Sequence, residues 1–517
     1  MRARPGAAPP RVGTARLAAP AVAAPALAAL ALAAPALAAL ALAALLAGCS
    51  PYSTKVRGVP ATSPSSGTPW TPPAKREAPP NRAASVAVPP DLAERIARLT
   101  LGDIVDLALR NNASTAASWA SARAAAASYA AERRSYLPSA SLEGSVTRLQ
   151  SAATQGRSAA RQTIYSPSAQ ISYLLFDFGG RSGSVDAARQ TLLAADWTHN
   201  ATIQGVVLLV EQSYFQYLAT KELLVAQRVT LDEAKTNLEA AEERHKLGLA
   251  TIGDVLQART ALSQAKLAVE STAGNLMTTR AALATSMGLP ANLPYDVEAV
   301  PDSTPALAVA DSVDTLIDRG LAARPDLAAA WATARAARAR VAATRADGLP
   351  SIELNGSAGK TYVDTRPKGS DVYNGSVSVS VPLFPGLTHR ENVKAAQAEA
   401  EALEAKARGL SDQVVYEVYS SYYAVRTATQ RVRTTQDLLA SAQQSEQVAL
   451  ARYKAGAGSA LDLLSAQSAL ADARAQSIDA RFGWYSSLAA LAHDAGILGI
   501  DGQSPLRLEA DTTETNP

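Results

Sequence analysis

Residues 244–256 read RHKLGLATIGDVL, and residues 452–464 read RYKAGAGSALDLL. In this stretch and just after it, one Arg, one Lys, one Gly, one Asp, one Leu and one Ala position recur at a constant offset of 208. Arg244 and Arg452 are one such pair. Upstream, Leu137-Pro138-Ser139 recurs as Leu349-Pro350-Ser351 at an offset of 212, so one connecting loop differs by four residues. A fixed long period predicts two copies of one structural unit.

Each copy is predicted to begin with a helix that stops before its Leu-Pro-Ser sequence, because proline ends helices. The first spans about 101–134, with Thr100 as its N-cap, and the second spans about 313–346, with an interruption near Arg324-Pro325. Two strands follow in each copy. In the clearest one, the alternation of Ser and Val over 376–381 puts Val on one face and Ser on the other. An outer-membrane barrel and a half-buried soluble sheet both show this pattern.

After each hairpin the chain is predicted to be helical over a very long distance. No proline lies between Pro167 and Pro290, or between Pro385 and Pro505. A helix from Gly180 to Lys246 would extend for about 100 Å at 1.5 Å per residue. A returning helix follows each Gly turn, over about 253–287 and 460–495, and should fold back antiparallel. Because such helices exceed any compact domain, they must build a tube or a rod.

Composition excludes several classes of function. The 49 basic and 46 acidic residues give a net charge of +3, without the concentrated basic face of a nucleic-acid-binding protein. The four histidines have no ligand spacing, so no metal or other cofactor is expected. No phosphate-binding loop follows a strand, and Asp177-Phe178-Gly179 is interpreted as a strand-to-helix turn. We therefore expect a protein that is not an enzyme and that takes its energy from a partner.

The N-terminus is interpreted as a targeting segment. Residues 1–48 combine early arginines, a long Ala/Leu run and the sequence Leu46-Ala47-Gly48-Cys49, which is typical of a secretory signal. A transmembrane helix is the alternative, although its prolines and the cysteine fit it poorly. The end of the segment resembles the bacterial lipobox, which implies that Cys49, the only cysteine, is the lipidated first residue. Residues 49–94 are rich in Pro and Ser and predict an extended tether, and 501–517 predict a frayed tail.

The strand count poses a closure problem. Four strands per chain are too few for a closed barrel, which needs about eight. Open edges are forbidden in a membrane, where each unpaired backbone group costs several kcal/mol. Membrane hairpins would therefore have to be completed by other chains. Three copies would supply twelve strands, and two copies would supply eight.

The doubled plan, the order of hairpin and long helix, and the two turn sequences resemble the TolC-like outer membrane efflux family, in its lipoprotein branch. The resemblance covers about 95–500, with repeats over 95–290 and 312–500 and a linker over 291–311. It implies a mainly α fold with a small β part, in which a homotrimer forms a 12-stranded transmembrane β-barrel continued by a long periplasmic α-helical barrel. It also implies the exit duct of a tripartite efflux or type I secretion system in the outer membrane. The implied partners are outer-membrane lipid, a periplasmic adaptor and an inner-membrane pump.

The resemblance also suggests roles at the turns. They would form the periplasmic tip and contact the adaptor, although turn and capping chemistry explains much of the same motif. The adaptor-contact candidates are Leu247, Gly248, Leu249, Thr251, Ala455, Gly456, Ala457 and Ser459. The gate candidates are the hydrogen-bonded pair Asp254 and Tyr453, an apolar ring at Leu461 and a charged ring at Asp462. Gly458 and Ser465 depart from the family pattern, so the gate is expected to have fewer ionic links.

One rival from another class stays open at this point. A periplasmic lipoprotein with a coiled-coil tether, a small soluble sheet and no pore would explain the helices and Cys49. It would not explain the alternating Ser/Val strands.

Overall fold

The computed structural model describes residues 55–56, 59–60, 98–150, 161–298, 308–364, 368–384, 388–498 and 508–509. The expected signal 1–48, Cys49, and most of the tether 49–94 and of the tail 501–517 lie outside these residues. The chain divides into the units Met1–Asn81 and Arg82–Pro517. In the first unit, the two-residue strands β1 (Lys55–Val56) and β2 (Val59–Pro60) pair antiparallel. The fold of interest is the second unit.

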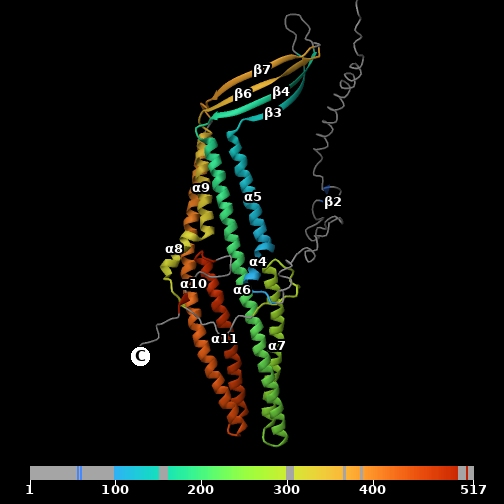
Figure 1. Ribbon diagram of the computed structural model, residues 1–517, viewed down its shortest axis with the longest axis vertical. Coiled ribbons are helices and arrows are strands. Elements are labelled where there is room, and N and C mark those ends of the chain that lie inside the picture. The colour runs from blue at the N-terminus through green and yellow to red at the C-terminus, as the bar shows by residue number, and fades with distance from the viewer. Residues whose placement is uncertain are drawn as a thin grey trace, which may run out of the picture. The chain divides into compact units, whose positions relative to one another are not determined.

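The second unit contains the same series of elements twice (Figure 1). The first copy comprises α4 (Leu101–Asn111), α5 (Ala113–Arg133), the short 3-10 helix η1 (Arg134–Tyr136), β3 (Ser139–Gln150), β4 (Arg161–Phe176), α6 (Gly180–Lys246) and α7 (Ile252–Ser286). The second comprises α8 (Val313–Ala323), α9 (Pro325–Ala346), β6 (Ser351–Val363), β7 (Ser370–Ser380), α10 (Thr388–Lys454) and α11 (Ala460–Asp494). The predicted mainly helical fold of two tandem copies is confirmed.

The first helix of copy one is broken, contrary to the prediction of a continuous helix over about 101–134. It ends at Asn111, and Asn112 adopts an extended conformation that begins α5, where its side chain accepts a hydrogen bond from the backbone N–H of Ser114. The break has a packing reason. Gly288 lies directly against it, because a Cβ built at Gly288 would lie 2.6 Å from the Asn111 oxygen. In copy two, Gly496 lies in the same way against the break at Arg324, which Pro325 had revealed in the sequence.

The two hairpins form one antiparallel sheet in the order β3-β4-β6-β7. The central pair, β4 with β6, joins the two copies, with Ile171 opposite Gly356 and Tyr173 opposite Leu354. The register continues across the sheet, since Leu354 lies opposite Val377 of β7. Within the described residues, β3 and β7 each have only one partner strand.

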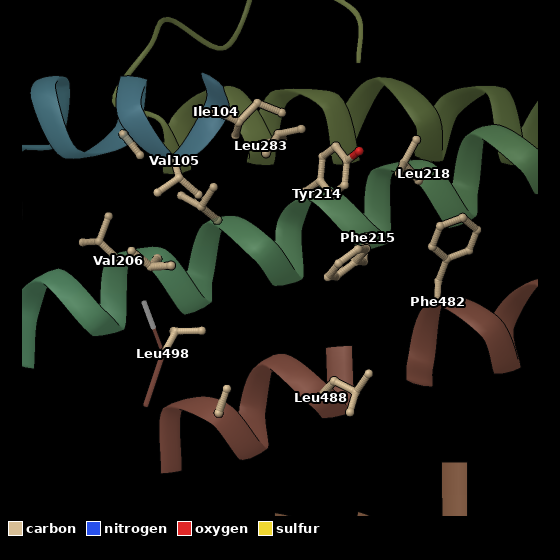
Figure 2. Close-up of a cluster of buried hydrophobic side chains, with 14 of the residues drawn as sticks. Ile104, Val105, Val206, Tyr214, Phe215, Leu218, Leu283, Phe482, Leu488 and Leu498 are labelled. Atoms are coloured by element: carbon tan, nitrogen blue, oxygen red, sulfur yellow. The ribbon is translucent and has the colours of Figure 1, made fainter. Parts of the chain in front are cut away.

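The helices pack along their length around α6 and α10, which have 67 residues each. α6 contacts α5 and α7 from its own copy and α9 and α11 from the other, whereas α10 contacts chiefly α8, α9 and α11. Near the middle of α6 lies the main hydrophobic cluster, which includes Leu218 and in which Phe215 points toward α11, the helix of Phe482 and Leu488 (Figure 2). The sheet follows one end of the long helices and the turns close the other, so the two lie at opposite ends of the unit.

The segments outside the repeats also contact the fold. In the linker, the Asp296 carboxylate accepts hydrogen bonds from Lys221, at 2.7 Å, and from the Tyr217 hydroxyl, at 3.1 Å. The strand β8 (Leu508–Glu509) pairs with β5 (Ala308–Val309), so two residues of the expected frayed tail 501–517 are paired through backbone hydrogen bonds with the linker.

Candidate functional site

The two turns at the far end of the long helices have the same backbone. At the first, Gly248 has φ of +72°, and the backbone N–H of Leu249 donates to the Arg244 oxygen at 2.8 Å. At the second, Gly456 has φ of +71°, and Ala457 donates to the Arg452 oxygen at 2.8 Å. These bonds satisfy carbonyls at the end of α6 and α10, and the left-handed position favours Gly because it lacks a Cβ.

Each returning helix starts with a capping box. Thr251 accepts a hydrogen bond from the Asp254 N–H, and the Asp254 carboxylate accepts from the Thr251 N–H at 2.8 Å. Ser459 and Asp462 do the same at the second turn, at 3.1 and 3.2 Å. The Ser459 hydroxyl and N–H lower the pKa of Asp462, because they stabilise its carboxylate. Four of the predicted tip and gate residues therefore have a structural role as caps.

The tips differ in their exposed side chains. At the first tip, Leu247 and Leu249 are 72% and 66% exposed. The second tip carries the small residues Ala455, Gly456 and Ala457, all exposed. A closed turn does not require exposed leucines, so the first tip offers an apolar surface that turn chemistry alone does not explain.

The two tips are joined by Arg244 and Tyr453. The Arg244 guanidinium lies 4.6 Å from the centre of the Tyr453 ring, and its Nη1 donates to the Tyr453 carbonyl oxygen at 3.0 Å. Asp254 is engaged by Thr251 in its capping box within the single chain, and its pairing with Tyr453 at the gate stays a prediction. Arg244, one residue of the repeated motif, thus connects the two copies at the tip.

The two predicted ring positions lie side by side at the start of α11. Leu461 is 59% exposed, whereas the next leucine, Leu463, is buried. The exposed Leu461 and the Asp462 cap face the surroundings of the single chain, so both positions are accessible for contacts outside it. An open groove of about 640 Å³ follows between the two helical hairpins, with α6, α7 and α11 as its walls. Small residues such as Ala261, Ala265 and Ser468 line the groove. In the sequence, only the spacing of these small residues indicates it.

The sheet has two chemically distinct faces. Polar residues from all four strands align in rows across one face and line a groove of about 310 Å³, and one such row is Ser141, Gln170, Ser357 and Asn374. The other face is apolar and uncovered. Leu142 is 85% exposed, Val377 is 63% exposed and Tyr373 is 87% exposed. A half-buried soluble sheet would cover this apolar face, so the arrangement favours a sheet whose apolar face meets lipid.

No group of three or more His, Cys, Asp or Glu side chains in the described residues is arranged to hold a metal ion. None of the described helices combines the length and the apolar character needed to cross a membrane.

Comparison with known proteins agrees with this geometry. The profile of the family described as "Outer membrane efflux protein" matches residues 104–289 and 316–496. Protein CyaE of Bordetella pertussis is 28% identical over 425 residues, covering 80% of this chain and 88% of that protein. Outer membrane protein OprJ of Pseudomonas aeruginosa is 26% identical over 380 residues, covering 70% of this chain and 77% of that protein.

Solved structures show the same fold. The CmeC outer membrane channel of Campylobacter jejuni superimposes with a TM-score of 0.69 at 21% identity, covering 78% of this chain and 86% of that one. A membrane protein from Pseudomonas aeruginosa gives a TM-score of 0.70 at 25% identity, covering 84% of this chain and the whole of that one.

Proposed function

The chain belongs to the outer membrane efflux protein family, whose members are transport channels, and from that premise we propose how it works. Three copies form a passive duct across the outer membrane and the periplasm. A periplasmic adaptor binds the helical tips, an inner-membrane pump drives the export, and lipid on Cys49 anchors each copy to the outer membrane.

The observation that carries this proposal is the unfinished sheet. Its edge strands β3 and β7 lack outer partners among the described residues, while its apolar face is exposed. In a bilayer each unpaired backbone group costs several kcal/mol, so the edges must be paired by other strands. Since β7 of one copy and β3 of the next both lack an outer partner strand within the described ranges, identical copies can close the sheet. Three copies supply twelve strands, which surround a pore and leave the polar face toward its interior.

The tips support the adaptor contact. Leu247 and Leu249 are exposed next to a rigid turn fixed by Gly248 and the Thr251 cap. An apolar surface on a rigid turn suits a partner that buries the leucines. The second tip, with Ala455, Gly456, Ala457 and Ser459, has no bulky side chains and allows close approach of a partner backbone.

The gate proposal keeps Asp254 and Tyr453 as a pair and adds Arg244, which contacts Tyr453 within one chain. Leu461 and Asp462 follow in α11 and would form rings when three copies surround one axis. Moving the tips apart would separate the Arg244 guanidinium from the Tyr453 ring, so this contact holds the tips together.

The test is an assay of the full-length, membrane-extracted protein. Native mass spectrometry should give trimers, and planar lipid bilayers that receive the protein should show single-channel currents. A monomer without currents would overturn the proposal and favour the scaffold without a pore. Labelling with radioactive palmitate tests the anchor separately, since Cys49→Ser should lose the label.

A further inference from the structure

The apolar face of the sheet changes from uncharged to charged toward the end that lies away from the helices. Along β6, every second residue from Ile352 to Ala358 belongs to this face, and none of these residues is charged. Further along, the face presents Tyr362, which lies directly opposite Tyr165 of β4. From Ile352 to Tyr362 the strand extends for about 33 Å, and a tilt of about 40° reduces this to about 25 Å, the usual height of an apolar band.

Two arginines follow just beyond the tyrosines on the same face. On β3, Arg148 lies opposite Thr163, which is two residues from Tyr165 on β4. Arg161 lies two residues further along β4 in the same direction, and both arginines are exposed. Such diagonal positions on neighbouring strands are about 7–8 Å apart, so the two guanidinium groups can reach the same ligand.

The two guanidinium groups keep their charge uncompensated within the described residues. No ion pair in this part of the chain includes Arg148 or Arg161. The Arg161 Nε donates a hydrogen bond to the Gln150 side-chain oxygen at 2.9 Å, which orients the guanidinium without neutralising it. The outer nitrogens of both arginines are therefore available to an anion outside the chain.

The remaining charges at this end are engaged or positive. The Lys360 ammonium, which lies on the apolar face between Ala358 and Tyr362, is 3.4 Å from the Asp371 carboxylate. The Asp364 carboxylate accepts a hydrogen bond from the Thr163 N–H at 3.0 Å. Lys368, just before β7, is exposed. The arginines thus lie in a positively charged border above the tyrosines.

The end of the sheet next to the helices has a different chemistry. Leu383 and Phe384 are 92% and 84% exposed there, and Phe178 is 51% exposed. Arg181 at this end is turned toward the protein, since its guanidinium lies 4.4 Å from the centre of the Tyr136 ring and donates to backbone oxygens. The two borders of the apolar face therefore suit different headgroups.

We propose that Arg148 and Arg161 bind the phosphates of a lipid headgroup in the outer leaflet, and that this lipid is a glycolipid with phosphate groups on its sugars. The arginines lie at the end of the sheet away from the helices (Figure 1), which reaches the outer leaflet in the proposed duct. A guanidinium binds phosphate oxygens through two parallel hydrogen bonds. The acyl chains of the same lipid cover the apolar face below the tyrosines. The inference rests on the proposed function.

Native mass spectrometry of the full-length protein in detergent tests this binding. The protein receives equal amounts of bis-phosphorylated lipid A or of phosphatidylcholine, and the lipids retained on the trimer are counted. The wild type should retain lipid A in excess, and Arg148→Gln with Arg161→Gln should weaken its binding about tenfold. Arg148→Lys with Arg161→Lys keeps the charge but loses the paired hydrogen bonds, so its binding should be intermediate.

A matched control removes two cations at the other end of the unit. Lys246 and Arg259 each form an exposed ion pair, with Glu243 and Glu242. Lys246→Gln with Arg259→Gln should retain lipid A like the wild type. Trimers are read from the same spectra, and if the double glutamine variant did not assemble, Arg148→Gln alone should still weaken the binding of lipid A.

The outcomes separate this inference from the proposed function. Trimers that conduct current but bind lipid A no better than phosphatidylcholine would overturn the inference and leave the duct intact. So would equal binding of lipid A by the double glutamine variant and the wild type, or an equal loss in the tip control. Displacement of lipid A by inorganic phosphate at the concentration of the lipid phosphates would assign the arginines to a free anion and overturn the lipid. A monomer without currents would overturn both proposals.

Discussion

At the scale of single residues, equivalent positions in the two copies make different contacts. Arg244 crosses to Tyr453, whereas Arg452 stays at its own turn, near the Ala457 oxygen at 3.4 Å. The repeated sequence revealed both turns, because Gly and a capping pair act locally. It did not reveal which arginine crosses, because that depends on how the two hairpins pack.

The link between Arg244 and Tyr453 should control leakage through the closed duct. Arg244→Ala removes a cation–π contact and a hydrogen bond, together worth about 1–2 kcal/mol, so the open population in planar bilayers should rise about 5- to 30-fold. Tyr453→Phe keeps the ring and the carbonyl and should behave like the wild type. Lys246→Ala is the control, because its ion pair with Glu243 is exposed on both sides. If Tyr453→Phe also raised the open population, the Tyr453 hydroxyl would be part of the gate.

Glu211 is the second residue with a specific consequence. Burial raises its pKa from the ordinary 4.5 to about 7, because the carboxylate loses hydration. Since the folded state holds this proton more tightly than the unfolded state, wild-type stability falls as the pH rises from about 4.5 to 7. Glu211→Gln should therefore be more stable than the wild type at pH 8, by up to about 3 kcal/mol, and similar to it near pH 4.5.

Thermal unfolding in detergent at the two pH values measures this difference. The exposed Glu270 gives a matched control, since Glu270→Gln on α7 should change the melting temperature equally at both values. If the advantage of Glu211→Gln were the same at both pH values, the carboxylate would not be buried in the assembled protein.

At the scale of elements, the long helices and the alternating strands were predicted closely, because proline-free periodicity and period-two alternation are strong local signals. α6 begins and ends where the sequence placed it, at Gly180 and Lys246. The break at Asn112 was missed, because Pro325 marks it only in copy two. The pairing of β4 with β6 could not be predicted either, since it joins strands about 190 residues apart, as Ile171 and Gly356 illustrate.

Two glycines with the same backbone conformation allow the cost of left-handed strain to be measured apart from the cost of a packing clash. Gly248 has φ of +72° and open space around it, whereas Gly288 has φ of +73° and would place a Cβ 2.6 Å from the Asn111 oxygen. Gly248→Ala should lower the free energy of unfolding by about 1–2 kcal/mol through left-handed strain alone. Gly288→Ala adds a clash with the break between α4 and α5 and should cost about 1–3 kcal/mol more. If both substitutions lowered the free energy of unfolding in urea by the same amount, the break between α4 and α5 would accommodate the added Cβ without a cost.

At the scale of the whole molecule, the internal duplication sets the number of contacts that a single chain leaves open. In the sheet, the junction of β4 with β6 joins the two copies, and β3 and β7 are the outer strands of the described residues. The two tips and the two edge strands therefore follow from the same duplication. The sequence could indicate this pattern through its period, but it could not tell which side chains would stay bare, because burial depends on three-dimensional contacts.

The two faces of β7 allow a final prediction about the membrane. Val377 lies on the exposed apolar face, and its neighbour Ser378 lies on the polar face. In a barrel, Val377→Arg places a charge toward lipid at a cost of about 1–4 kcal/mol that depends on its depth, so the yield of heat-modifiable trimers in outer membranes should fall. Ser378→Arg points into the pore, so trimers should form normally while the current carried by cations decreases. The adjacent positions control for strand propensity and for the added charge. Equal trimer yields for both variants would mean that the apolar face of the sheet does not meet lipid.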